Sequence, residues 1–424
     1  MQFLHMVLCG SLISIKMNIF IIVILIILII LIFYLIIDIL ISVHRTKYIG
    51  NTQNGRRLYD VVNKDTDIIS LEPPSTTLHK VIGQGNYGTV HLYVNKKNNS
   101  FRWYAVKESR ETKSNKEYEN SKYLNTQMTS TKSMIAMDAV GYDYRICSIY
   151  SVKKDKDKTL VYMQYANGGS LKNFIEKLKK NNKIPKGYMT MIKIIVFNVI
   201  SAVYALHHEF QLAHLDLKPE NILFLEDPLA TTDTKEKHLR CANLRLIDFG
   251  LSERITYPPI TIYRKGTPLN MPPEVLLYSE MKLNPKFDTW AIGCIIYNLI
   301  TLERLFEEYK TEESLLKAHS HIIRNPDEFS TALESISPDA TLTDLLKCAL
   351  ELDINRRKTV GSLLNHPWFD TVPLSCVPNY LYKYDDVRRL DNNINKTNKF
   401  LNKHVILKNK KIMQVVQQLK IFYK

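Results

Sequence analysis

The sequence has few of the features that small secreted domains and metal-binding modules use. Its six cysteines are scattered along 424 residues without a Cys-x-x-Cys pair, so neither a disulfide framework nor a zinc module is expected. It contains no internal repeat, which argues against a repeat architecture. It also lacks a DNA- or RNA-binding motif, so its net charge of +15 does not predict a nucleic-acid partner. Hydrophobic residues make up 45% of the chain, which is enough to bury a large core.

A long uncharged segment stands near the N-terminus. Nineteen apolar residues run from Ile19 to Ile37, enough for a helix to span a hydrocarbon core of about 30 Å. A buried core helix is the alternative, but soluble proteins seldom contain helices that are hydrophobic on every face at this length. A cleaved signal peptide fits less well, because the run is long and no small-residue cleavage pattern follows it. We therefore predict a transmembrane helix at residues 17–43, after a short segment at 1–16.

Charges beside this segment predict its orientation. Lys16 precedes it, whereas several cations follow it: Arg45, Lys47, Arg56 and Arg57. Because cytoplasmic flanks carry an excess of Lys and Arg, the chain beyond the span is expected in the cytoplasm, beginning with a polar linker at 44–77. Fewer than twenty residues precede the span, so no extracellular binding domain is expected. Met17 could equally be the first residue.

The densest motif in the chain is HLDLKPEN at residues 214–221, followed by DFG at 248–250. Its carboxylates, amide and ammonium suit phosphoryl transfer, which needs positioning and charge neutralisation more than covalent chemistry. Asp216 would accept the proton of a substrate hydroxyl, and Lys218 would lie beside the transferring group. Asn221 and Asp248 would hold a metal ion. Each short motif occurs by chance in solvated loops, but their ordered combination does not.

A glycine-rich segment lies upstream with the pattern G-x-G-x-x-G-x-V, between residues of strand character. Glycine lets the backbone approach phosphate groups closely, so its N–H groups could cover a nucleotide. The hairpin context disfavours a Rossmann turn, in which the glycines join a strand to a helix. The residues expected at the nucleotide are Ile82, Gly83, Gln84, Gly85, Asn86, Tyr87, Gly88, Thr89 and Val90.

In this order, the motifs resemble those of the eukaryotic protein kinase family. The resemblance covers residues 78–370 and ends in His366-Pro-Trp-Phe369. It implies ATP and Mg²⁺ as cofactors and protein substrates, with the nucleotide in a cleft between two lobes. The implied fold is α+β, with a β-rich N-lobe at 78–163, a hinge at 164–168 and a helical C-lobe at 169–370.

The resemblance assigns further residues to the ATP site. Lys107, which ends the apolar strand seventeen residues after Val90, would hold the α- and β-phosphates, with Ala105 nearby. Met163 matches the gatekeeper position of the family. The backbone from Gln164 to Ala166 would pair with the adenine base.

A helix after Lys107 should supply a glutamate that holds this lysine, and Glu117 and Glu119 are the candidates. We prefer Glu117, although this choice puts Asn120 and Ser121 at positions that usually pack on the lobe core. Because the segment between Lys107 and this helix is short and charged, we expect the helix to be poorly anchored.

Two residues indicate the substrate class. Lys218 has the form found in serine/threonine kinases, and Thr267 matches the threonine that in those enzymes bonds the catalytic aspartate and lysine. Ser170 stands where some kinases selective for basic substrates have a glutamate. Glu220 leaves a preference for basic substrates open.

Leu215 is the main departure from the family, which commonly has arginine between the histidine and the aspartate of this motif. That arginine docks a phosphorylated activation-loop residue through bidentate hydrogen bonds. We therefore predict activity without phosphorylation of Thr256, Tyr257, Thr261 or Tyr263. The predicted function is a membrane-anchored serine/threonine kinase. The alternative is a pseudokinase that acts as a membrane-tethered scaffold. It is supported by Leu215, by Pro272 in place of the usual alanine and by the poorly anchored helix expected after Lys107.

The segment 371–424 is predicted to be a basic tail, with eleven Lys or Arg against three acidic residues. It would be either solvated or docked on an anionic membrane surface. Residues 153–158 are expected to form a charged hairpin turn, and residues 225–240 a surface insertion. The sequence gives no indication of the oligomeric state.

Overall fold

The computed structural model describes residues 76–85, 88–97, 100–129, 143–155, 157–181, 184–378 and 380–381. Apart from residues 96–102, these residues belong to one compact unit. The segments predicted at 1–16 and 17–43, nearly all of the linker at 44–77 and most of the basic tail lie outside them. The membrane helix and the role of the tail therefore stay predictions.

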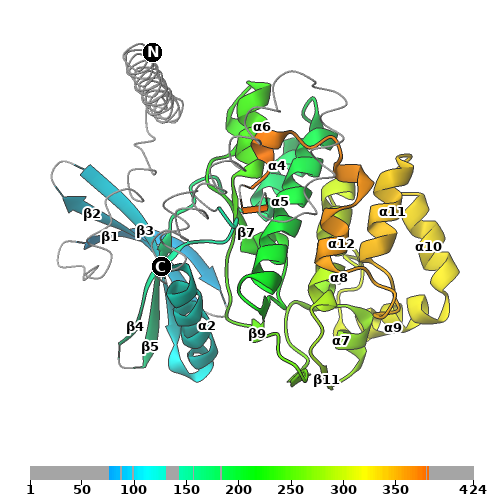
Figure 1. Cartoon of the computed structure of the whole chain (residues 1–424), viewed down its shortest axis with the longest axis horizontal. Helices are drawn as coiled ribbons and strands as arrows, with labels where there is room; N and C mark the ends of the chain where they lie inside the picture. The colour runs from blue at the N-terminus through cyan, green and yellow to red at the C-terminus, as the bar shows by residue number, and fades with distance from the viewer. Residues whose placement is uncertain are drawn as a thin grey trace, which may run out of the picture. The chain divides into compact units, whose positions relative to one another are not determined.

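The N-lobe is built on a five-stranded sheet with the strand order β1-β2-β3-β5-β4 (Figure 1). Side chains that face the core, such as Tyr104, Val106 and Val161, are buried and apolar. β1 and β2 form the predicted hairpin, and the charged turn predicted at 153–158 joins β4 to β5. The strands are β1 (Thr76–Gly85), β2 (Gly88–Lys97), β3 (Ser100–Arg110), β4 (Ile149–Asp155) and β5 (Lys158–Gln164).

Helix α2 (Glu111–Thr129) packs against β4 and β5. It has few apolar residues, of which Leu124 is fully buried. Glu117, Asn120 and Ser121 are also buried, so polar side chains fill much of the interface. We expected this helix to be poorly anchored, and that expectation was wrong, because buried polar side chains anchor it in place of apolar ones.

The C-lobe is helical, and α5 lies at its centre, in contact with α6, α8 and α12 (Figure 1). Ile192, Ile195 and Phe197 of α5 are completely buried. The helices are α4 (Leu171–Asn181), α5 (Tyr188–His208), α6 (Thr234–Ala242), α7 (Pro273–Leu277), α8 (Lys286–Thr301), α9 (Glu312–Arg324), α10 (Pro326–Glu334), α11 (Ala340–Ala349) and α12 (Val360–Leu364). Together with the N-lobe sheet, they confirm the predicted two-lobed α+β fold.

Helix α5 also meets the length and composition of a membrane span. Most of its residues are buried within the C-lobe, as in the core helix of a globular domain. Among the described residues it is the one helix with these properties.

Three pairs of short strands hold the loops between residues 212 and 282. β6 (Leu212–Ala213) pairs with β9 (Glu253–Arg254), and β7 (Ile222–Phe224) pairs with β8 (Leu244–Leu246). β10 (Thr261–Tyr263) pairs with β11 (Glu280–Lys282). Because β6 leads into residues 214–221 and β7 leads out of them, both ends of this loop are held by backbone hydrogen bonds. Five short 3₁₀ helices complete the described elements: η3 (Pro219–Asn221), η4 (Pro228–Ala230), η5 (Pro268–Asn270), η6 (Pro367–Phe369) and η7 (Leu374–Cys376).

Two segments pack more closely than expected. Residues 225–240 form η4 and most of α6, which lies against α5, so they are part of the C-lobe. The first residues of the predicted tail are also packed, with Val372, Cys376 and Tyr380 buried. The Tyr380 hydroxyl donates to the carbonyl of Ser201 in α5. The C-lobe packing therefore continues as far as residue 381.

Candidate active site

The loop at residues 214–221 is held by a buried aspartate beneath it. Asp288 of α8 accepts hydrogen bonds from the backbone N–H groups of His214 at 2.7 Å and Leu215 at 2.8 Å. His207 lies 2.8 Å from the same carboxylate. Burial opposes ionisation of Asp288, but the hydrogen bond and charge of His207 outweigh it and lower the pKa of Asp288. The charged carboxylate thus fixes the loop, including Leu215 in its left-handed conformation at φ 67°.

Three side chains converge at the carboxylate of Asp216. Lys218 Nζ donates to Oδ2 at 2.7 Å, and the Thr267 hydroxyl donates to Oδ1 at 2.7 Å. Lys218 Nζ lies 2.9 Å from Thr267 Oγ1, which closes a triangle of contacts. Asn221 Nδ2 donates to the Asp216 carbonyl at 2.9 Å and to Oδ2 at 3.3 Å. The structure therefore brings together both residues predicted as catalytic and one of the two predicted metal ligands.

Gly266 makes the approach of Thr267 to this loop possible. It has φ 112°, and a Cβ atom here would lie 2.5 Å from the Leu215 carbonyl oxygen. Real Cβ atoms do not come this close to backbone oxygen, so any other residue would push the two segments apart.

A second charged group lies between the lobes. Lys107 Nζ is 2.7 Å from Glu117 Oε1 of α2 and 2.8 Å from Asp248 Oδ1. Glu119, the alternative candidate for this contact, is exposed. Burial opposes the charge on Lys107, but Asp248 and Glu117 outweigh it and raise the pKa of Lys107. Burial also disfavours ionised Asp248, yet the Lys107 ammonium lowers the pKa of Asp248. Both groups are therefore charged at neutral pH.

The predicted nucleotide segment includes the end of β1 and the start of β2. Ile82, Gly83, Gln84 and Gly85 lie in β1, and Gly88, Thr89 and Val90 lie in β2. Asn86 and Tyr87 fall outside the described residues.

Packing requires glycine at position 88 of the β1–β2 hairpin but not at position 85. Gly88 has φ 141°, and a Cβ atom there would lie 2.1 Å from the Glu108 carbonyl oxygen, so only glycine fits against β3. A Cβ atom on Gly85 would meet nothing within 4 Å. Because packing does not require glycine at position 85, its open side is available to a ligand.

The predicted hinge follows β5. Met163 is paired with Ala105 across β3 and β5, which places the two residues side by side. The Gln164 N–H donates to the Ser148 carbonyl at 2.9 Å, so this N–H already has a partner in the protein. Within the described part of the chain, the Ala166 backbone makes no hydrogen bond. Its N–H and C=O groups are thus open to a planar base.

Helix α2 contributes contacts to the site that the sequence did not predict. Asn120 Nδ2 donates to the carbonyl oxygens of Phe249 at 2.8 Å and Ser252 at 2.9 Å. Glu253, the next residue, bonds Lys116 of the same helix at 2.6 Å. The signal for these contacts was the presence of polar residues where the family has apolar ones. In the sequence these polar residues indicate a departure from the family but not the contacts that they make.

An ion pair joins Arg357 to Glu274 of α7, the last residue of the activation segment (residues 248–274). The two guanidinium nitrogens of Arg357 donate to the two carboxylate oxygens at 2.6 and 3.1 Å. Arg357 is completely buried, and its Nε donates to the Glu351 carbonyl at 2.8 Å. The bond forms normally although Pro272 stands where the family usually has alanine.

Glu220 is not free to bind a substrate. Arg304 donates to its Oε1, and Lys172 Nζ lies 3.5 Å from the same atom. Burial opposes ionisation of Glu220, but the Arg304 hydrogen bond and charge outweigh it and lower the pKa of Glu220. The sequence left open a preference for basic substrates. Because Glu220 is paired within the protein, it does not offer an unpaired carboxylate to a basic substrate residue.

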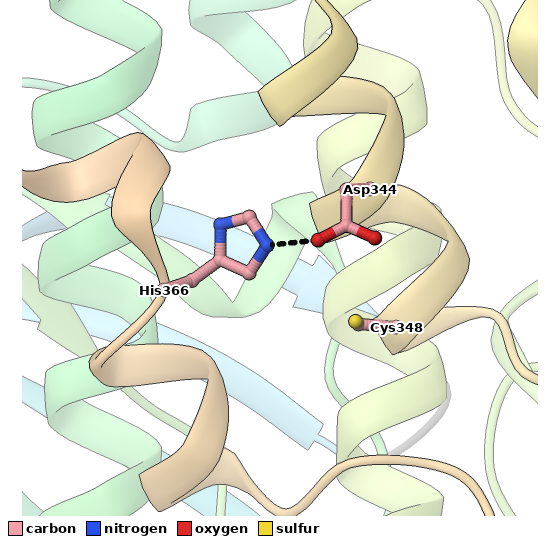
Figure 2. A group of neighbouring side chains, drawn as sticks. All are labelled: Asp344, Cys348 and His366. Carbon is pink, nitrogen blue, oxygen red and sulfur yellow. Dashed lines mark hydrogen bonds and ion pairs between the residues drawn. The ribbon is translucent and has the colours of Figure 1, made fainter.

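A separate group of potential ligands lies in the C-lobe, where α11 presents Asp344 and Cys348 toward the ring of His366 (Figure 2). His366 Nε2 is 2.9 Å from Asp344 Oδ2, and its Nδ1 accepts a hydrogen bond from the Trp368 N–H at 3.2 Å. Because both ring nitrogens are already engaged and Nδ1 caps η6, we interpret the group as a structural link between η6 and α11.

One known protein family matches the region that contains all of these motifs. Residues 76–369 match the protein kinase domain family. The chain belongs to the protein kinase family. The chain is 31% identical over 324 residues to calcium-dependent protein kinase 6 of Plasmodium berghei (strain Anka), an alignment that covers 74% of this chain. A probable serine/threonine-protein kinase fhkA of Dictyostelium discoideum is 26% identical over 343 residues, and the CDPK-related kinase 4 of Arabidopsis thaliana is 32% identical over 250 residues.

The relatives are longer than the matched region. The alignments cover 19%, 51% and 38% of the Plasmodium, Dictyostelium and Arabidopsis proteins, and 74%, 74% and 57% of this chain. What the kinase family implies here is therefore the domain itself, with ATP and typically Mg²⁺ as its cofactors.

Proposed function

We propose that this protein transfers the γ-phosphate of ATP to Ser or Thr hydroxyls of protein substrates. The observation that carries the proposal is the contact of Lys218 and Thr267 with opposite oxygens of the Asp216 carboxylate. The carboxylate is held in one orientation, as a base that must meet a substrate hydroxyl requires. Thr267 also supports the serine/threonine class.

Each predicted residue has a role that its contacts support. Asp216 accepts the proton of the hydroxyl, and Lys218 offsets negative charge that develops beside it. Lys107, held by Glu117, would bind nucleotide phosphates. Asp248 and Asn221 offer carboxylate and amide oxygens, the ligand types that Mg²⁺ prefers. Bound ATP and Mg²⁺ supply the phosphoryl group and neutralise its charge.

Two features near Asp216 bear on the choice of substrate. A small pocket beside Asp216 and Thr267 is lined mainly by apolar side chains, including Leu215, Ile262 and Val275. With a volume of about 20 Å³ it is too small for a substrate side chain, so it gives no support for an apolar preference. Because Glu220 is paired within the protein, we expect no strong selection for a basic residue at that site.

Phosphate transfer by the full-length protein, purified in mild detergent with Mg-ATP, tests this proposal. Libraries with Ser, Thr or Tyr as the acceptor separate the substrate classes. Asp216→Asn should lower transfer to Ser and Thr about 10²–10⁴-fold without preventing ATP binding. Absence of transfer by folded wild-type protein that binds ATP would instead favour the membrane-tethered pseudokinase scaffold.

We propose further that residues 17–43 anchor the protein in a membrane with the kinase domain in the cytoplasm. The support is the apolar run Ile19–Ile37 and the cations that follow it. The protein should stay in the membrane fraction after alkaline carbonate extraction and leave it when residues 17–43 are deleted. In sealed vesicles of known orientation, protease should digest the kinase domain from the cytoplasmic side. Extraction by carbonate, or digestion only from the other side, would contradict the proposal.

A further inference from the structure

Glu253 is a carboxylate bound by two lysines from different parts of the kinase domain. Its Oε2 lies 2.6 Å from Lys116 Nζ and its Oε1 lies 2.5 Å from Lys265 Nζ. The Glu253 side chain is 14% exposed, compared with 41% for Lys116 and 23% for Lys265. The carboxylate is therefore mostly removed from water, with one lysine on each oxygen.

The three residues belong to elements that carry the active-site groups. Lys116 in α2 directly precedes Glu117, which holds Lys107. Lys265 stands two residues before Thr267, which bonds Asp216. Glu253 lies in β9, where it is paired with Ala213, the residue before His214. One carboxylate thus connects the helix glutamate, the catalytic loop and the segment that carries Thr267.

The local electrostatics favour the charged bridge. Burial opposes ionisation of Glu253, but hydrogen bonds and charges from Lys116 and Lys265 outweigh it and lower the pKa of Glu253. Burial lowers the pKa of Lys265 against the attraction of Glu253. Loss of the carboxylate would leave Lys265 partly buried without its partner, so the segment before Thr267 would be destabilised together with α2.

We propose that Glu253 is a positioning residue that couples α2 to the segment carrying Thr267 through Lys116 and Lys265. The bridge holds the Lys107–Glu117 pair and the Thr267–Asp216 contact in place at the same time. The bridge is formed by unmodified side chains, so it does not require phosphorylation. Its effect on catalysis rests on the kinase activity proposed above, whereas its effect on α2 does not.

The test compares Glu253→Gln, Lys116→Met and the double variant in the full-length protein. Gln keeps the shape of the side chain and removes its charge. We expect Glu253→Gln to lower kcat about 10-fold or more with a smaller change in KM for peptide. Amide hydrogen exchange in α2 should become faster. If Glu253 and Lys116 act through one bridge, the double variant should lose far less than the product of the two single losses.

Glu313→Gln is the matched control, because the Glu313–Lys317 pair of α9 is a 2.6 Å ion pair with both side chains exposed. It should leave kcat and α2 exchange unchanged, whereas Glu253→Asp, which keeps the charge, should recover part of both.

An unchanged kcat and unchanged α2 exchange in Glu253→Gln would overturn the bridge, as would fully multiplicative losses in the double variant. An inactive wild-type protein would instead count against the kinase activity, and α2 exchange would still decide whether Glu253 holds the helix.

Discussion

Helices α5 and α2 are held in place by different kinds of side chain. α5 buries a nearly continuous set of apolar residues, among them Ile192, Ile195 and Phe197. α2 buries Glu117 and Asn120, and both have partners outside the helix. Burial of apolar surface stabilises α5 regardless of charge, whereas the position of α2 depends on groups that must stay ionised or hydrogen-bonded. The C-lobe is therefore expected to be the stable platform, and α2 the element whose position controls activity.

The largest effect on stability should come from a substitution that removes apolar contacts of α5. Phe197 is fully buried in α5, with its ring centroid 5.5 Å from that of Phe369. Phe197→Ala should lower the free energy of unfolding by about 3–5 kcal/mol, because it removes apolar contacts and leaves a cavity. Chemical denaturation measures the loss. Activity per folded molecule should stay close to that of the wild type. A loss of kcat without a loss of stability would contradict the view that α5 supports stability and α2 controls activity.

A polar ring in the apolar C-lobe core should give it a measurable pH dependence. His319 of α9 is fully buried beside Phe306, and neither ring nitrogen has a partner among the described residues. Burial lowers the pKa of His319 to about 4. Since the unfolded state binds a proton near pH 6.5 and the folded state does not, stability should fall as pH drops from about 7 to 4.

The loss over this range should be on the order of 2–3 kcal/mol. His319→Leu should remove most of this pH dependence when unfolding is measured across the range. His321→Leu is a suitable control, because His321 lies on the same helix and its side chain is 58% exposed. An equal pH dependence in wild type and His319→Leu would show that the ring does not cause it.

The polar contacts of α2 can be tested by a substitution at Asn120. Asn120→Leu keeps the approximate volume and removes the hydrogen bonds to Phe249 and Ser252. The carbonyl groups left without a donor should loosen the segment that follows Asp248, so we expect kcat to fall about 10-fold. The melting temperature should change less than kcat, because the apolar core of the C-lobe, which the substitution does not touch, supplies most of the stability. If kcat is unchanged while α2 exchange is also unchanged, the amide does not position this segment.

Residues with a fixed chemical task were the easiest part of the fold and site to infer from sequence. Asp216, Lys218, Asn221 and Asp248 have characteristic spacings. The structure brings the first three together and places Asp248 at Lys107. The β1–β2 hairpin was predicted from the strand character of the residues beside the glycines and the helical C-lobe from the resemblance, and both were confirmed.

The contacts of α2 and Glu220 could not be inferred, because they depend on residues far apart in the chain. The partners of Asn120 could not be inferred, because the carbonyl groups of Phe249 and Ser252 that it binds are 129 and 132 residues away. Glu220 was considered available because Arg304, 84 residues later, carries no sequence signal of its pairing. Spacing in sequence predicts residues that share one loop, but it does not predict the partner that tertiary folding supplies.

The smallest effect should come from the activation segment itself. Thr256, Tyr257, Thr261 and Tyr263 are exposed or lie at its surface, and Tyr257 is 99% exposed, so a kinase could modify them. A phosphate there would need cations to order the segment. Position 215 is leucine, and the nearby Lys116 and Lys265 are already bound to Glu253. Replacement of the two threonines by Ala and the two tyrosines by Phe should therefore change kcat by less than about 3-fold.

Mass spectrometry would establish that the wild-type comparison sample carries phosphate on this segment, and phosphatase treatment would supply a second unmodified sample. Both unmodified samples should match the phosphorylated protein. A loss of more than 10-fold in each would mean that a phosphate orders the site in addition to Glu253. In that case Glu253→Gln should be partly compensated by phosphorylation, because the added phosphate would draw Lys116 and Lys265 toward the same position that the carboxylate occupies.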